Sequence, residues 1–214
     1  MSILGRPLFY SLAVALLGFT LNAQQAQKSA SPQPGTSVRD AGAVTNGFYR
    51  NSTLGFTCKI PFGWVERTNE MTEGSNGNSS DSKQSILLLA VFEHPPEATS
   101  DSINAAIVVA AEAASAYPGL RSAQQYFEPL TALTKSKGLT VANEPYEFRV
   151  GATPLVRGDF SKAIGNLTMR QSTLVIMERG YIVSFTFIGG SEDEVDGLVE
   201  ALSFGRKEAP AAPK

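Results

Sequence analysis

The chain is poor in the residues that catalytic and metal sites most often use. Of its 214 residues, one is a cysteine, one a histidine and one a tryptophan. A lone cysteine excludes an intramolecular disulfide, so stability must come from a packed core. His94 would have to serve any serine–histidine, cysteine–histidine or histidine–metal scheme, and no motif for one surrounds it. The diproline after His94 instead predicts an exposed place at the end of a strand. We therefore predict no catalytic residues, no cofactor and no metal ion.

The chain also has no large excess of positive or negative charge. The chain has 18 lysines and arginines against 20 aspartates and glutamates, which gives a formal net charge of −2. The basic residues are spread along the sequence without clusters. A nucleic-acid groove needs a basic patch that neutralises phosphates, so no nucleic-acid partner is expected.

An apolar run near the N-terminus, Leu8 to Phe19, is shorter than the roughly 18 residues that a membrane-spanning helix needs. It follows Arg6 and is followed by the small residue Ala23, an order typical of a secretory signal peptide. We predict a signal peptide over residues 1–23 and export to the periplasm or beyond, in keeping with a bacterial protein. A retained membrane anchor is the alternative.

Composition divides the rest of the chain. Residues 24–46 and 206–214 are rich in small residues and proline and show no periodicity, so they cannot repay the entropy lost on ordering. They are predicted to be a flexible linker and a flexible tail. Residues 47–205 are predicted to form one domain without internal repeats.

Apolar patterns predict the strands of this domain. Phe56, Cys58 and Ile60 alternate with polar residues, the period of a half-buried strand. Residues 85–92 and 105–111 are nearly continuous apolar runs, typical of central strands covered on both faces. For residues 105–111, a buried helix is the alternative. Short links predict that four later strands form an antiparallel meander. These strands are 146–150, 155–162, 167–178 and 181–188.

Two segments have the helical period. Ser191 and Glu194 match a capping box, and an apolar stripe that runs to Leu202 follows them. A second helix is predicted over residues 122–137, with a bend at Pro129 because an interior proline disrupts helical hydrogen bonding.

A family resemblance rests on a tyrosine strand, a Gly-Phe strand and a Pro-x-x-Trp turn near the start of the domain, with Leu-Ser-Phe at its end. The residues are Tyr49, Asn51, Gly55, Phe56, Pro61, Gly63, Trp64, Leu202, Ser203 and Phe204. With this element order the chain resembles the PsbP-like superfamily, which includes PsbP, the Ran-binding Mog proteins and DcrB-type exported bacterial proteins. The resemblance implies an α+β fold, an α/β/α sandwich whose central, mainly antiparallel sheet is flanked by helices. Members act as assembly factors, subunits or chaperones, but a shared fold does not transfer a function.

Cys58 and Trp64 each have two interpretations. A reactive thiol needs exposure and a lowered pKa, whereas the apolar side of an alternating strand predicts that Cys58 is a small buried hydrophobe. The place of Trp64 after a Pro-Gly turn predicts a ring at the edge of the core, with a ligand pocket as the alternative.

Residues 67–84 form a polar stretch longer than ordinary connections. Its composition predicts disorder. The alternative is a loop ordered by a hard cation on Glu70, Glu73 and Asp81, although their spacing does not match the regular calcium loop. These three acids, together with Trp64 and His94, are the candidates for partner contact.

The residues favour binding over chemistry. We predict an exported, non-catalytic accessory domain that contacts a protein or an envelope component, with peripheral membrane association included. The partner, its pathway and the oligomeric state have no signature in the sequence. Two alternatives stay open: a hydrolase or metal-assisted enzyme built from scattered loop residues, and a carrier of a small apolar ligand.

Overall fold

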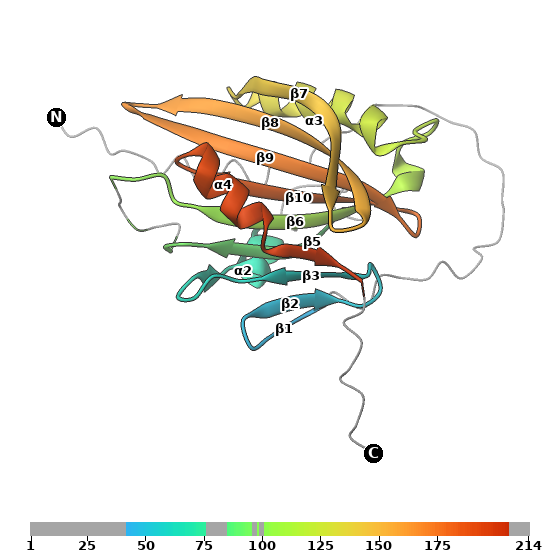
Figure 1. The fold of residues 1–214 in the computed structure, drawn as a ribbon, viewed down its shortest axis with the longest axis horizontal. Coiled ribbons are helices and arrows are strands. Elements are labelled where there is room, and N and C mark those ends of the chain that lie inside the picture. The colour runs from blue at the N-terminus through green and yellow to red at the C-terminus, as the bar shows by residue number, and fades with distance from the viewer. Residues whose placement is uncertain (1–41, 76–84, 96–97, 99–100, 206–214) are drawn as a thin grey trace, which may run out of the picture.

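The computed structural model describes residues 42–75, 85–95, 98 and 101–205, and over them the chain forms eleven strands, three α-helices and one short 3₁₀ helix (Figure 1). The strands are β1 (Ala43–Thr45), β2 (Phe48–Asn51), β3 (Phe56–Lys59), β4 (Val65–Glu66), β5 (Ser85–Phe92), β6 (Ala106–Ala113), β7 (Thr140–Val150), β8 (Thr153–Ile164), β9 (Leu167–Glu178), β10 (Tyr181–Gly189) and β11 (Leu202–Phe204). The helices are α2 (Thr68–Ser75), α3 (Ala123–Ser136) and α4 (Glu192–Val199), with the 3₁₀ helix at Ala114–Ala116.

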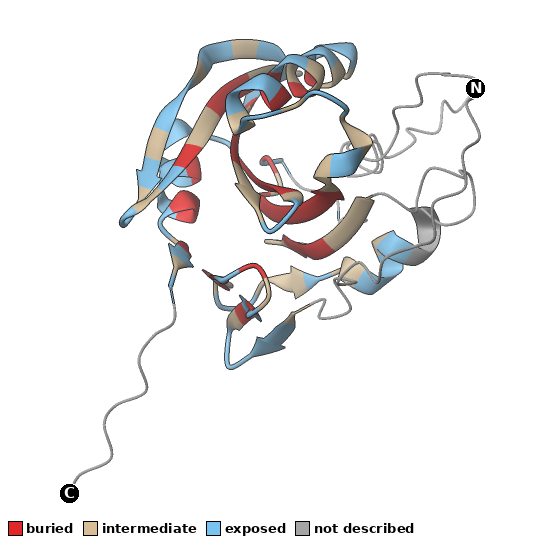
Figure 2. Ribbon diagram, turned by 90° about the vertical axis from the view of Figure 1, so that its right-hand side faces the viewer, coloured by how far each residue is buried: buried red, intermediate tan, exposed pale blue. Residues whose placement is uncertain are grey.

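The described strands belong to two sheets, and neighbours in both are antiparallel. The large sheet has the order β4-β5-β6-β10-β9-β8-β7, and the small sheet has the order β1-β2-β3-β11. The large sheet is strongly curved, and the small sheet packs against part of it (Figure 2). The antiparallel meander β7 to β10 is confirmed, and each of its three links has two residues.

The main core lies between the two sheets. Phe56 of β3 meets Phe185 of β10 edge to face, with ring centroids 4.9 Å apart. Cys58 belongs to this core and is fully buried, which confirms its prediction as a core residue. Helix α4 extends the same layer, with Val195, Leu198 and Val199 buried.

Helix α3 covers the opposite face of the large sheet. Tyr126, Phe127 and Leu130 pack against Val175 of β9 and Ile182 of β10. Ser122 caps this helix, since its Oγ accepts a hydrogen bond from the backbone of Gln125, as the sequence predicts. Pro129 lies inside the helix.

The mixed α and β class and the antiparallel sheet are confirmed, but the α/β/α sandwich is only partly right. One face of the large sheet carries α3. The other face carries α4 together with the whole small sheet, so this side is covered mostly by strands. The expectation of a single sheet fails because the turn between β3 and β4 carries the chain from one sheet to the other.

Several boundaries also differ from the prediction. Residues 43–45, placed in the flexible linker, form β1 through pairing with β2. Residues 68–75, placed in the disordered loop, form α2, while residues 76–84 lie outside the described part of the chain. Strand β7 begins at Thr140 and has register shifts before Tyr146. Leu202 lies in β11 rather than in the last helix.

Tertiary contact explains α2. Thr68 Oγ1 accepts a hydrogen bond from the backbone N–H of Ala90 at 3.0 Å, and the N–H of Arg67 donates to the carbonyl of Ala90 at 2.8 Å. The start of α2 therefore continues the pairing of β4 and covers an edge of β5 that would otherwise be open. Composition alone does not contain this contact.

Candidate functional site

Arg157 of β8 is the centre of a polar cluster on the face of the large sheet that carries α4. Its Nε lies 2.8 Å from Asp159 Oδ1, and its Nη2 lies 2.6 Å from Asp196 Oδ1 of α4. Nη2 also donates to Ser172 Oγ of β9 at 2.9 Å, and the guanidinium lies 5.2 Å from the ring centroid of Phe148. The side chain is 11% exposed. One arginine thus joins three consecutive strands, β7, β8 and β9, to α4.

The carboxylate of Asp159 accepts hydrogen bonds from four side chains. Besides Arg157, Asn143 Nδ2 donates to its carboxylate at 3.1 Å and the Tyr146 hydroxyl at 3.4 Å, and Ser172 Oγ is a close fourth donor. A buried carboxylate with this many donors is held in one position. The position of Asp159 in turn fixes the position of the Arg157 guanidinium, through the hydrogen bond from Arg157 Nε.

Two side chains of this cluster, Arg157 and Tyr146, have shifted pKa values. Burial lowers the pKa of Arg157, but hydrogen bonds to Asp159 and Asp196 outweigh burial, and the pKa is raised above its ordinary value. Burial and then the charge of Asp159 raise the pKa of Tyr146, so its hydroxyl stays a neutral donor. The hydrogen bonds and ion pairs of Arg157 therefore hold the cluster in one preformed arrangement.

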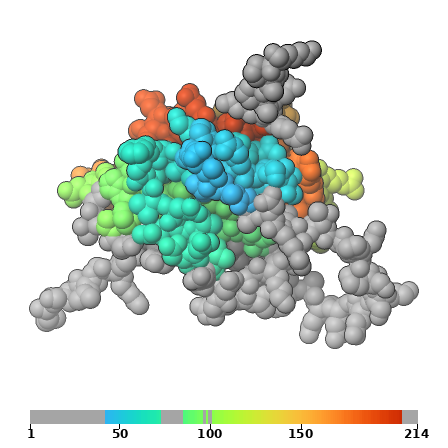
Figure 3. All heavy atoms as spheres, turned by 90° about the horizontal axis from the view of Figure 1, so that it is seen from below, coloured from blue at the N-terminus to red at the C-terminus, as the bar shows by residue number. Residues whose placement is uncertain are grey.

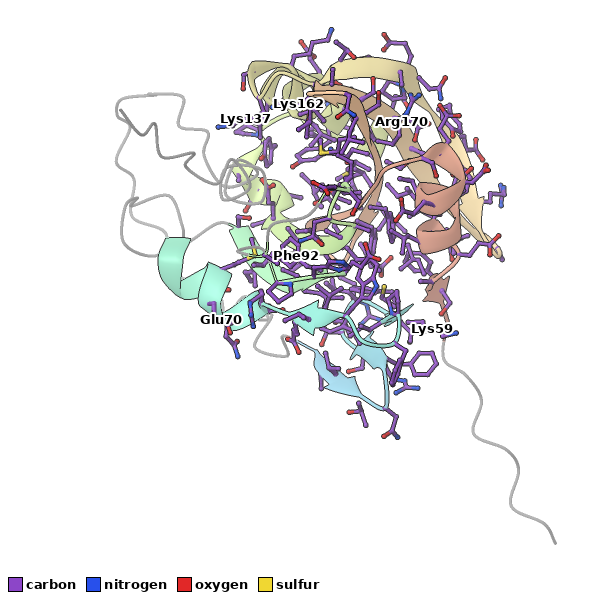
Figure 4. All side chains as sticks on the ribbon, turned by 90° about the vertical axis from the view of Figure 1, so that its left-hand side faces the viewer. Lys59, Glu70, Phe92, Lys137, Lys162 and Arg170 are labelled. Carbon is purple, nitrogen blue, oxygen red and sulfur yellow. The ribbon has the colours of Figure 1, made fainter. Side chains whose placement is uncertain are left out.

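Two hollows lie on either side of the Arg157–Asp196 ion pair, since both residues line both of them. The first has a volume of about 180 Å³ and is polar, with Asn143, Tyr146 and Arg170 in its wall. Arg170 stands beside α4 (Figure 4), with Nη1 3.2 Å from Glu192 Oε1.

The second hollow, of about 440 Å³, lies between β7 and the end of α4. Its apolar wall consists of Phe148, Val150, Val199 and Leu202. We call the two hollows together the α4 groove.

Strand β7 forms one rim of the α4 groove and is an outer strand of the large sheet, pairing with β8 on one side only among the described strands. The two-residue hairpin loop makes Val150 and Thr153 a hydrogen-bonded pair, and such pairs alternate along an antiparallel ladder. Arg149 and Glu147 therefore direct their backbone N–H and C=O groups away from β8. Pro154, which has no N–H, faces Arg149, as this alternation requires.

The predicted contact residues do not gather here. Trp64 is half-buried and packs against the main core, and His94 is exposed at the far end of β5. Asn104 holds only the backbone of His94, donating to its carbonyl at 2.9 Å and accepting from its N–H at 3.0 Å. Glu70 is exposed on α2 and pairs with Arg67 at 3.6 Å. Asp81 and the side chain of Glu73 lie outside what the structure describes.

The sequence analysis missed the α4 groove, although a signal for it exists. Arg157 and Asp159 sit at alternating positions in a strand, in register with Leu174 and Ser172. They therefore point to the same face as the buried Leu155. Two opposite charges on an inward face are unusual unless they are paired.

Glu112 of β6 is a second buried acid, and it lies on the opposite face of the large sheet. Its carboxylate accepts hydrogen bonds from Tyr126 at 2.8 Å and from Tyr117. Burial raises the pKa of Glu112, and the two tyrosine hydrogen bonds oppose this only in part. The sheet itself separates Glu112 from Asp159 and Asp196.

Within the described ranges, no three histidine, cysteine, aspartate or glutamate residues come together where they could hold a metal ion. Nor is any helix there long and apolar enough to cross a membrane.

Comparison with known proteins gives similarity to solved structures only. No family model matches the chain, and no curated protein matches it. The structure is similar to cyanobacterial PsbP (CyanoP) from Synechocystis sp. PCC 6803, with 13% identity and a TM-score of 0.46 over 76% of this chain and 96% of the other. It is also similar to LpqN, involved in cell envelope biogenesis of Mycobacterium tuberculosis, with 13% identity and a TM-score of 0.39 over 71% of this chain and 83% of the other. A protein of unknown function from Pseudomonas aeruginosa shows 12% identity and a TM-score of 0.36 over 72% of this chain and 88% of that one. Scores this low do not place the chain in a family, and the PsbP-like resemblance stays a prediction.

Proposed function

We propose that the protein is an exported, non-catalytic accessory domain that binds an extended segment of a partner protein along β7, with side chains of that segment in the α4 groove. The observation that carries this proposal is the open edge of β7 beside an apolar hollow. The leader pattern of residues 1–23 supports export.

Strand addition explains both features of the α4 groove. An added strand would use the outward backbone groups of Glu147 and Arg149 for main-chain hydrogen bonds, which give affinity without sequence preference. Alternate side chains of the same strand would point into the hollow lined by Phe148 and Val199, which supplies specificity. The bulged first half of β7, which includes Pro145, blunts the rest of the edge and confines addition to residues 146–150.

The arrangement of acids favours binding over hydrolysis. Two-carboxylate chemistry needs an acid and a base with separated pKa values on either side of one substrate. The buried acid with a raised pKa, Glu112, lies on the opposite face of the large sheet from Asp159 and Asp196. The thiol of Cys58 is buried, and burial raises its pKa to about 12, far from that of a nucleophile at neutral pH.

The test is selection of ten-residue peptides from a randomised phage library on the full chain, followed by affinity measurement of the selected peptides by fluorescence anisotropy. Arg149→Pro removes the outward N–H of an edge strand, where proline is tolerated. The matched control, Arg149→Gln, removes the same side chain but keeps the N–H. We expect Arg149→Pro to weaken peptide binding about tenfold or more through the lost hydrogen bond, and Arg149→Gln to leave it nearly unchanged. Circular dichroism shows that both variants are folded.

Failure to select any peptide above background contradicts the proposal, as does equal binding to the two variants. If Phe148→Ala instead abolishes binding of a small apolar probe while no peptide binds, the protein is a carrier of apolar ligands.

A further inference from the structure

The turn after β3 places a phenylalanine fully in solvent. Phe62 has a relative exposure of 106%, the highest of the large apolar side chains that the structure describes. The N–H of Trp64 donates to the carbonyl of Pro61 at 3.3 Å and Gly63 has φ +86°, the pattern of a type II turn. The turn is held at both ends, because Pro61 restricts the backbone and Trp64 packs against the core. A single exposed apolar residue is ordinary, so its surroundings decide what it means.

The turn lies at one end of the small sheet, directly after β3, and the outer face of this sheet begins there. Side chains in register with the buried Tyr49 and Cys58 point to the core, so the alternate positions point outward. On β1 to β3 these are Ala43, Thr45, Phe48, Arg50, Thr57 and Lys59. They include two cations and no acid. Figure 3 looks onto this side of the molecule, with β1 to β3 in blue and cyan.

The cations are arranged around a second aromatic ring. The guanidinium carbon of Arg50 lies 5.1 Å from the ring centroid of Phe48, and Lys59 is the cross-strand partner of Phe48. Lys59 points away from the core (Figure 4). The N–H of Ile60 donates to the carbonyl of Gly47 at 2.8 Å, which fixes the Phe62 turn at this end of the sheet. We call Phe48, Arg50, Lys59 and Phe62 the basic aromatic face.

We propose that the basic aromatic face docks on an anionic lipid bilayer, with Phe62 entering the interface and Arg50 and Lys59 contacting lipid phosphates. A protruding apolar side chain and adjacent cations are the two signals that together give stable but reversible attachment to a membrane surface. Charge complementarity favours an anionic bilayer over a neutral one. The basic aromatic face shares no residue with the α4 groove.

The first experiment uses the full chain and vesicles of phosphatidylglycerol and phosphatidylcholine in equal parts, with pure phosphatidylcholine vesicles for comparison. Phe62→Cys carries an environment-sensitive fluorophore, which labels this site alone because Cys58 is fully buried. The matched control places the same fluorophore at Ala132→Cys, an exposed position on α3. We expect a blue shift of emission at position 62 with the anionic vesicles and none at position 132.

The second experiment measures vesicle affinity by sedimentation. The variant with Arg50→Gln and Lys59→Gln is compared with Arg121→Gln and Lys135→Gln, which removes the same charge from the α3 side of the molecule. We expect the first pair to lower affinity roughly 25-fold, about fivefold for each cation, and the second pair to leave it nearly unchanged. All variants keep the same N-terminus, so its contribution cancels.

An equal blue shift with neutral vesicles, a shift at position 132, or equal loss in the two charge pairs overturns the proposal. A response at position 62 to a purified protein partner but not to vesicles also overturns it. None of these results bears on peptide binding at β7, so the two proposals fail separately.

Discussion

Gly158→Ala tests the docking of α3 on the large sheet with a single methyl group. Gly158 lies on β8 directly beneath Phe127, and a Cβ at this position would be 2.6 Å from Phe127 Cε1 and 3.1 Å from Cδ1. Phe127 is 2% exposed, so its ring cannot swing into solvent. We expect Gly158→Ala to lower the free energy of unfolding by about 1–3 kcal/mol, the usual cost of overpacking. This loss exceeds the gain of about 0.5–1 kcal/mol that alanine normally has over glycine inside regular structure.

Gly197→Ala is the matched control, because Gly197 lies inside α4 and a Cβ there meets no atom within 4 Å. It should raise the free energy of unfolding by up to about 1 kcal/mol, since alanine is the better helix former. The assay is urea unfolding followed by far-UV circular dichroism, with the slope m compared between variants. The two alanine substitutions should therefore have effects of opposite sign.

A double-mutant cycle assigns the loss to the ring. Phe127→Leu alone should cost about 1 kcal/mol or slightly more. Combined with Gly158→Ala it should cost less than the sum by about 1 kcal/mol, because the smaller side chain relieves the contact. Additive effects, or a loss below about 0.5 kcal/mol in Gly158→Ala, would mean that α3 does not pack on β8 as described.

Four further outcomes are expected. The pKa of Glu112 is raised in the folded protein, so folding disfavours its ionised form. The free energy of unfolding of the unsubstituted chain, relative to that of Glu112→Gln, should therefore fall as pH rises above 4.5, the ordinary value for a glutamate. A difference that stays constant with pH in urea unfolding refutes the burial of Glu112 as the cause. Cys58 should react slowly with thiol reagents until denaturant is added, and fast labelling of the native protein would contradict its burial. Arg157→Gln should lower the free energy of unfolding by about 2–4 kcal/mol, since Asp159 loses its charge partner, and Asp159→Asn in the same chain should recover part of this loss. N-terminal sequencing of the exported protein should begin near residue 24, and recovery of the intact leader from the cytosol would refute cleavage.

Local patterns predicted most of the elements. Ser191 shows why this works, because its Oγ accepts from the N–H of Glu194 at 3.1 Å, a contact between residues three apart. The other half of the predicted capping box is altered, since the Glu194 carboxylate accepts from the N–H of Gly190 at 2.7 Å. Strand β9 has the predicted bounds because its length is set by the short links on either side. Such features depend on residues close together in the sequence, so the sequence pattern is enough to predict them.

The candidate sites could not be predicted in the same way. Arg157 and Asp196 are 39 residues apart, and their contact exists only because α4 packs on β9 and β10, next to β8 in the large sheet. Trp64 and His94 drew attention because they are unique, but rarity carries no information about position in space. The exposure of Phe62 was equally hidden, since an aromatic residue in a strand-end turn, two positions before a tryptophan, is as compatible with the core as with solvent.

The amino-acid pattern is enough to predict a mixed α and β domain with a core free of disulfides, a buried Cys58 and an antiparallel meander. These properties follow from composition, from the period of apolar residues and from link length, which act over a few residues. Long-range packing sets three other features: the division of the strands into two sheets, the helix at residues 68–75 and, among the described strands, the open edge of β7 beside α4. Each of these features depends on which segments, far apart in the sequence, pack together and exclude water. Many different pairings of strands and helices are compatible with the same local pattern, and only the packing of the whole core selects one of them.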